Sequence, residues 1–175
     1  SRLDREGPLP IPDTLRILED VASALDFAHQ RGILHRDIKP ENIVLQGNRA
    51  IVLDFGVARA MSEAADDKLT TAGTSVGTPA YMSPEQAAGN PSLDPRSDVY
   101  SLGCVLFEML GGESPFSGRT PRAVIAKQVS QPPPPLRVIR PSISEPVEAV
   151  VRKSLEKVPG DRYRTAGEMA ADLKR

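Results

Sequence analysis

The first regular pattern of apolar residues along the chain has the spacing of an α-helix. Six of these residues recur mostly at intervals of three or four positions: Leu15, Leu18, Val21, Ala22, Leu25 and Ala28. One side of a helix collects residues at these intervals, so the pattern predicts an amphipathic helix over residues 12–30. Gly32 is expected to end it, because glycine readily adopts the left-handed conformation that follows many helices.

Two short runs of β-branched and apolar residues come next. Between residues 43–45 (Ile-Val-Leu) and 51–53 (Ile-Val-Leu) lies the polar stretch Gln-Gly-Asn-Arg at 46–49, which predicts a β-hairpin. A polar octapeptide at 35–42 leads into this hairpin, and Asp-Phe-Gly at 54–56 leads out of it. We therefore expect these polar residues to lie together at the open end of the hairpin, opposite its turn.

The second half of the chain is predicted to be mainly helical. Residues 99–110 are apolar almost all round and are followed by two glycines, which predicts a buried central helix. Further helices are expected over residues 121–129, 145–157 and 166–174. Four prolines at 132–135 are interpreted as a rigid connector, with an exposed polyproline ligand as the alternative. Residues 59–83 show no periodicity and are expected to form a mobile surface loop, which at this length is usually functional.

Composition and charge narrow the classes of protein that the chain can belong to. Its 175 residues are enough for one domain, and 39% apolar with 26% charged residues is typical of a soluble globular protein. With 22 basic and 23 acidic residues, charge favours neither nucleic acid nor an acidic membrane surface as partner. No apolar stretch reaches the roughly 20 residues of a membrane span. The single cysteine, Cys104, excludes an internal disulfide, and the absence of a secretory signal predicts a cytoplasmic location.

The octapeptide at 35–42 reads His-Arg-Asp-Ile-Lys-Pro-Glu-Asn, and Asp-Phe-Gly begins twelve residues after its Asn. A lone Asp in a polar loop is more often a turn residue than a base, but this combination is far more specific. It resembles the catalytic and metal-binding loops of Hanks-type serine/threonine protein kinases. Lys39, two positions after Asp37, resembles serine/threonine kinases rather than tyrosine kinases.

The resemblance implies a phosphoryl-transfer site that uses ATP and Mg²⁺. Asp37 would deprotonate the attacking hydroxyl of a protein Ser or Thr, and Lys39 would offset charge on the transferred phosphate. Asn42 and Asp54 would also be catalytic, as the oxygen ligands of Mg²⁺, and Val44 would lie beneath the adenine. The nucleotide site would be formed by Lys39, Glu41, Asn42, Val44 and Asp54.

A second motif resembles the end of a kinase activation segment, which would span residues 54–85. Residues 77–85 read Gly-Thr-Pro-Ala-Tyr-Met-Ser-Pro-Glu. By this resemblance Thr78 lies in the substrate site near the catalytic loop, and Glu85 forms an ion pair with Arg162. Arg36 is typical of kinases that need a phosphate on this segment. Candidate phosphorylation sites are Thr74 first, then Thr70, Thr71 and Ser75.

Four further residues are predicted to have structural roles. His35 is interpreted as a core histidine that holds the catalytic loop, and Phe55 supports the same region. Asp98 is expected to bind the backbone of this loop, although it also suits the first turn of a helix. His29 is interpreted as a helix-face residue at a turn, with no metal-ligand cluster around it.

The resemblance extends over nearly the whole chain, residues 1–175, but only to the larger, C-terminal lobe of the kinase fold, an α+β fold that is mostly helical. The sequence has no Gly-x-Gly-x-x-Gly loop and no Val-Ala-x-Lys strand. Since it also starts at Ser1 and not at Met, we expect a fragment with little activity by itself. The alternative is a naturally truncated lobe that binds proteins without catalysis. A small-molecule phosphotransferase fits poorly, and the motifs resemble bacterial kinases most.

Overall fold

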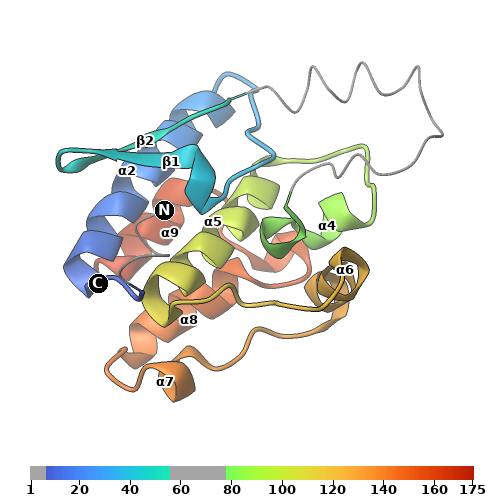
Figure 1. Cartoon of the computed structure of the whole chain (residues 1–175). Coiled ribbons are helices and arrows are strands. Elements are labelled where there is room, and N and C mark those ends of the chain that lie inside the picture. The colour runs from blue at the N-terminus through green and yellow to red at the C-terminus, as the bar shows by residue number, and fades with distance from the viewer. Residues whose placement is uncertain (1–6, 56–77) are drawn as a thin grey trace.

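The computed structural model describes residues 7–55 and 78–175 and is mostly helical, with one antiparallel hairpin (Figure 1). The helices and strands are α2 (Ile11–His29), β1 (Ile43–Gln46), β2 (Arg49–Val52), α4 (Pro84–Ala87), α5 (Pro95–Gly111), α6 (Pro121–Ser130), α7 (Leu136–Ile139), α8 (Glu145–Ser154) and α9 (Ala166–Leu173). Short 3-10 helices are η1 (Pro40–Asn42), η2 (Pro79–Tyr81) and η3 (Pro159–Asp161). No helix in the described ranges is long and apolar enough to cross a membrane.

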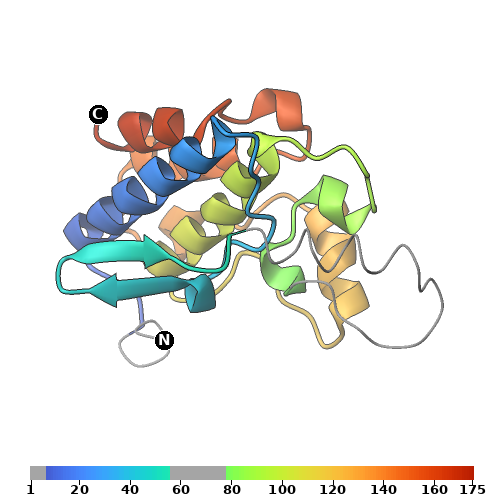
Figure 2. The ribbon, with the colours of Figure 1, turned by 90° about the horizontal axis from the view of Figure 1, so that it is seen from above.

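Helix α5 forms the centre of the molecule, with α2, α8 and α9 packed around it (Figures 1 and 2). Nearly all of its side chains are buried, which confirms the predicted central helix. It begins earlier than predicted, because the Asp94 carboxylate accepts a hydrogen bond from the Arg96 amide and Pro95 suits a first turn. Gly103 allows close approach of α8, since a Cβ atom there would lie 2.9 Å from Cβ of Ser154.

The amphipathic helix predicted over residues 12–30 is α2, whose apolar face packs on α5 and α9. Asp26, on another part of α2, accepts hydrogen bonds from the amides of Ala166 (3.1 Å) and Gly167 (3.0 Å) at the start of α9. These amides have no partner within their own helix, so a carboxylate from α2 satisfies them and joins the two helices. After α2, Gly32 adopts a φ of 73°, as predicted.

The hairpin has a shorter turn than the sequence suggested. Gln46 pairs with Arg49, so only Gly47 and Asn48 lie between the strands, and Gly47 has a φ of 59°. The second strand therefore starts at Arg49. Asp20 of α2 accepts a hydrogen bond from the Ala50 amide at 2.8 Å, which fastens the hairpin to the helix.

Helix α8 ends at Ser154, three residues before the predicted end at 157. The reason is tertiary: the carbonyls of Glu156 and Lys157 accept hydrogen bonds from the buried guanidinium of Arg162. The four prolines at 132–135 link α6 to α7 without helix or strand, consistent with a connector. Helices α4 and α7 were not predicted, since four residues are too few to show a period.

Candidate active site

The loop that carries the octapeptide is held by one buried carboxylate. Asp98 of α5 is 1% exposed and accepts hydrogen bonds from the amides of His35 and Arg36, each at 2.8 Å. Arg36 has a φ of 68°, a left-handed conformation that is unfavourable for a side chain of this size. The Asp98 contacts offset this strain, and they confirm the predicted bond from Asp98 to the loop.

His29 takes part in the same contact, which the sequence did not indicate. Its Nε2 lies 2.7 Å from Oδ2 of Asp98, so α2 and α5 meet at this carboxylate. The two residues are 69 positions apart, and the histidine side chain, at the end of α2, is 7% exposed. The signal in the sequence for this contact was that His29, a polar residue, lies on the apolar side of an amphipathic helix.

His35 is fully buried and joins the two polar loops. Its Nε2 donates to the Leu53 carbonyl at 2.7 Å, while its Nδ1 accepts from the Asp37 amide at 3.2 Å. The ring also packs edge-on against Phe55, with centroids 4.8 Å apart. One ring nitrogen donates and the other accepts, so this is a neutral imidazole in a structural role. The predicted supporting roles of His35 and Phe55 are consistent with these contacts.

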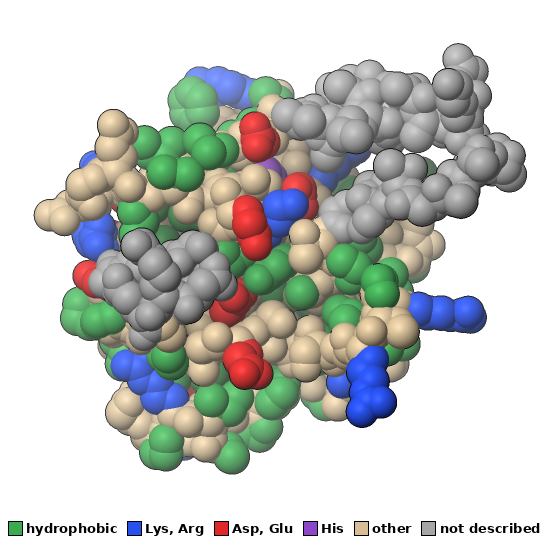
Figure 3. All heavy atoms as spheres, viewed as in Figure 1, with side chains coloured by type: hydrophobic (Ala, Val, Ile, Leu, Met, Phe, Trp, Pro, Cys, Tyr) green, Lys and Arg blue, Asp and Glu red, His purple; other side chains and the backbone are tan. Residues whose placement is uncertain are grey.

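Asp37, Lys39 and Asn42 lie together on this loop. Ile38 between the first two is fully buried, so Asp37 and Lys39 face outward, with their side chains 31% and 20% exposed. Nζ of Lys39 lies 2.8 Å from Oδ2 of Asp37. Asn42 donates from Nδ2 to the Asp37 carbonyl at 2.8 Å and to its Oδ2 at 3.3 Å. On the face of the molecule seen in Figure 3, acidic and basic side chains gather in one small area.

Asp54 joins this group through the backbone of the hairpin. The Leu53 amide donates to the Asn42 carbonyl at 2.8 Å, and the chain then leaves the strand with a φ of 62° at Asp54. Asp54 is exposed. Because Nδ2 of Asn42 is used by Asp37, its amide oxygen remains for a cation, together with the Asp54 carboxylate. Two oxygen ligands suit Mg²⁺, which usually keeps several waters.

The hairpin offers an apolar surface next to these polar groups. Val44, Ile51 and Leu53 are 40–43% exposed, and Val44 lies opposite Ile51 across the strands. Glu41 is exposed in η1, immediately before the hairpin. An uncharged flat ring could pack on such a surface.

Residues 78–86 contact the loop at 35–42 through Thr78 and Gln86. Nζ of Lys39 lies 3.5 Å from Oγ1 of Thr78, which places Thr78 beside the loop as expected. Gln86 donates from Nε2 to the Arg36 carbonyl at 2.9 Å, so the left-handed residue is held through both of its peptide groups. Ser83 and Gln86 form a capping box that starts α4.

Glu85 and Arg162 form the predicted ion pair. Two bonds, of 2.7 and 2.8 Å, join the carboxylate to the guanidinium, and the Arg162 side chain is completely buried. Ser97 donates a further bond to Glu85 at 2.6 Å. Burial by itself would raise the pKa of Glu85, but the bonds from Arg162 and Ser97 and the charge of Arg162 outweigh it and lower the pKa.

A model of the protein kinase domain matches residues 1–172 of the chain. The chain belongs to the protein kinase domain family. It is 47% identical over 171 residues to serine/threonine-protein kinase PknB of Mycobacterium tuberculosis, a match that covers 97% of this chain and 27% of the relative. The PknB of Mycobacterium leprae matches equally well, and a probable PknB of Corynebacterium glutamicum is 42% identical over 175 residues, with 97% and 27% covered. The kinase domain therefore resembles bacterial members, as expected, and spans about a quarter of these relatives' length.

Several predicted residues of this kinase domain lie outside the described ranges. Thr70, Thr71, Thr74 and Ser75 are among them, as are Gly56 and Gly77. Their predicted roles, and that of the activation segment as a whole, stay predictions.

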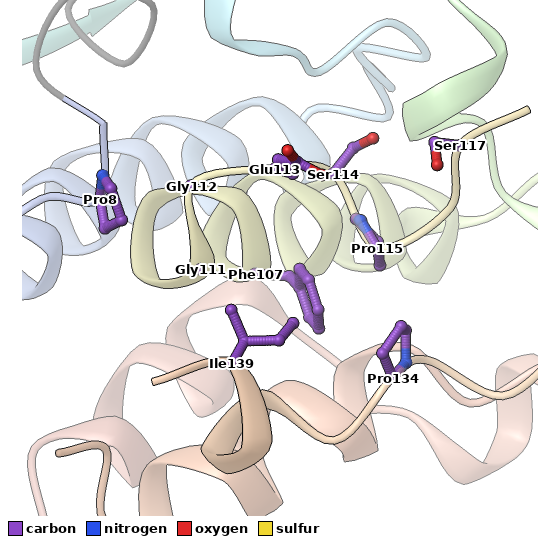
Figure 4. A pocket seen from close by; sticks show the side chains of 10 residues that line it. All are labelled: Pro8, Phe107, Gly111, Gly112, Glu113, Ser114, Pro115, Ser117, Pro134 and Ile139. Carbon is purple, nitrogen blue, oxygen red and sulfur yellow. The ribbon is translucent and has the colours of Figure 1, made fainter. Parts of the chain in front are cut away.

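One hollow in the described part of the kinase domain, of about 560 Å³, lies away from these residues (Figure 4). It opens at the C-terminal end of α5, between Pro8, Phe107, Pro134 and Ile139. None of the residues around it carries the candidate chemistry described above. In the described ranges, no three His, Cys, Asp or Glu side chains are grouped so that they could hold a metal ion.

Proposed function

We propose that this chain is the catalytic, C-terminal lobe of a serine/threonine protein kinase that transfers the γ-phosphate of ATP to protein hydroxyls. The catalytic loop is residues 35–42 and the activation segment residues 54–85. The observation that carries this proposal is the grouping of Asp37, Lys39 and Asn42 on one loop, with the Lys39 ammonium 2.8 Å from the Asp37 carboxylate.

Each of these side chains has a role in transfer to a hydroxyl. Asp37 orients the Ser or Thr hydroxyl and accepts its proton at Oδ2, the oxygen that contacts both Lys39 and Asn42. Lys39 can turn from Asp37 toward the transferred phosphoryl group, where its charge stabilises the developing negative charge. Asn42 holds the Asp37 backbone, so the carboxylate has a defined direction.

ATP and Mg²⁺ fit the same set of residues. Asn42 and Asp54 would hold Mg²⁺, and Val44 on the apolar face of the hairpin would contact the adenine, with Glu41 close by. When bound, Mg²⁺ neutralises charge on the phosphates and ATP supplies the phosphoryl group. The exposed apolar residues of the hairpin also suit coverage by an N-terminal lobe.

A catalytically inactive binding module is the other class of function. It would have no chemical need for Asp37, Lys39, Asn42 and Asp54 together, and the described contacts keep all four in or beside one loop. We therefore favour the enzyme. A cytoplasmic location and regulation by a phosphate on Thr74 remain parts of the proposal.

The test is peptide phosphorylation by the full-length protein that contains this sequence. Asp37→Asn keeps the size of the side chain and removes the base, so the rate is expected to fall by about 10²–10⁴-fold. The matched control is Asp13→Asn, in the first turn of α2, which should leave the rate near that of the unsubstituted protein. A near-normal rate for Asp37→Asn would overturn the assignment, and an inactive unsubstituted protein would favour the binding module.

A further inference from the structure

A buried amide on α6 holds the backbone of η2. Gln128 is completely buried, on a helix with few other buried residues. Its Nε2 donates to two successive carbonyls of η2, that of Pro79 at 3.1 Å and that of Ala80 at 2.7 Å. Carbonyls only accept, so the amide nitrogen must face η2 and the amide oxygen must face the other way.

The amide oxygen meets a second buried group. Tyr100 of α5 donates from its hydroxyl to Oε1 of Gln128 at 2.5 Å. The same hydroxyl accepts a hydrogen bond from Nζ of Lys157 at 3.0 Å, so its own proton is directed to Gln128. The carbonyls of η2 and the Tyr100 hydroxyl of α5 thus determine the orientation of one amide, and each polar atom of its side chain has a partner.

The segment held in this way leads directly to the candidate substrate site. Thr78 precedes η2, and its Oγ1 lies 3.5 Å from Nζ of Lys39. The Tyr81 amide donates back to the Thr78 carbonyl at 3.1 Å, so the position of η2 determines that of Thr78. A shift of η2 away from α6 would carry Thr78 away from the catalytic loop.

We propose that Gln128 is a positioning residue for the substrate peptide: by holding the carbonyls of Pro79 and Ala80, it sets the position of Thr78 beside Asp37 and Lys39. This inference rests on the proposed kinase function and extends it to α6, which contains none of the predicted site residues. Because the hydrogen bonds of Gln128 run to η2 and to Tyr100, the effect is expected on the peptide and not on ATP.

The test compares Gln128→Met with Gln131→Met in the full-length protein. Both remove an amide, Gln128→Met within α6 and Gln131→Met at the residue that follows it, but Gln131 is exposed and serves as the matched control. Loss of two buried hydrogen bonds to η2 is expected to raise KM for a peptide by roughly tenfold or more, with KM for ATP unchanged. Tyr100→Phe removes the partner of the amide oxygen and the acceptor of Lys157 but leaves the bonds from Gln128 to η2, so it should raise the same constant by a smaller factor.

A second readout separates the two proposals. Amide hydrogen exchange at Tyr81 and Met82 is expected to be at least about tenfold faster in Gln128→Met than in Gln131→Met. If the unsubstituted protein phosphorylates nothing but this difference is present, the kinase proposal fails while the role of Gln128 in holding η2 stands. An unchanged peptide KM in an active Gln128→Met variant, or an equal effect of both substitutions, would overturn the inference. If Gln128→Met does not fold, an unchanged peptide KM in Tyr100→Phe overturns it.

Discussion

The buried ion pair between Glu85 and Arg162 makes the sharpest prediction about stability. The Arg162 side chain is 0% exposed. Besides its two bonds to Glu85, it donates to the carbonyls of Arg96 (3.0 Å), Glu156 (2.7 Å) and Lys157 (3.0 Å). Arg162→Gln would leave the Glu85 carboxylate without its cation and these carbonyls without a donor. Removing one partner of a buried pair is expected to lower the free energy of unfolding by about 3–5 kcal/mol.

Arg164→Gln is the matched control, because it makes the same change two residues away. Arg164 is 82% exposed and pairs with Glu168 at 3.2 Å, an exposed pair worth at most about 1 kcal/mol. Urea unfolding, followed by circular dichroism, measures both. With a slope of about 2 kcal/mol per molar urea, Arg162→Gln should lower the midpoint by about 1.5–2.5 M and Arg164→Gln by about 0.5 M or less. Equal shifts would refute the argument that burial makes the first pair important.

The pH dependence gives an independent check of the same pair. The pKa of Glu85 is lowered in the folded protein, so its ionised form contributes stability above the ordinary carboxyl pKa of about 4.3. This contribution is lost as the pH falls through the lower pKa of the folded state. The gap between the unsubstituted protein and Arg162→Gln should therefore be wide at pH 7 and narrow toward pH 3.

Three further outcomes follow from other buried groups. Gly103→Ala, whose Cβ would lie 2.9 Å from Cβ of Ser154, should lower the free energy of unfolding by about 1–3 kcal/mol in thermal unfolding, and Ser154→Gly should recover part of the loss. Burial lowers the pKa of Lys157 to about 8, so from pH 8 to about 10 this group binds more protons in the unfolded chain, and the stability of the unsubstituted protein relative to Lys157→Met should rise with pH there. Burial also raises the pKa of the Cys104 thiol to about 12, so a thiol reagent should label it only after unfolding, and rapid labelling of the native protein would contradict its burial.

Local patterns in the sequence predicted most of the described fold. Helices α2 and α5 and the hairpin were predicted from the spacing of apolar residues and from the positions of glycines. Both signals lie among residues that are close together in the chain. The grouping of Asp37, Lys39 and Asn42 was predictable for the same reason, since the three lie within six positions of each other. The ion pair between Glu85 and Arg162 and the bonds from Asp98 to the loop backbone were predicted only through the resemblance to protein kinases. That resemblance supplied contacts between distant residues, which no local pattern contains.

Contacts between distant residues were decided by the tertiary structure alone. Asp26 caps α9 from 140 positions away, and the carbonyls after α8 are bound by Arg162, which ends that helix early. His29 meets Asp98, and Gln128 meets η2, only because α2, α5 and α6 are packed in this arrangement. A buried polar group must find a partner wherever the fold brings one, so its role depends on packing and not on its neighbours in the chain. The sequence thus determined the elements and the catalytic loop, while the packing of the helices decided which buried side chains hold that loop in place.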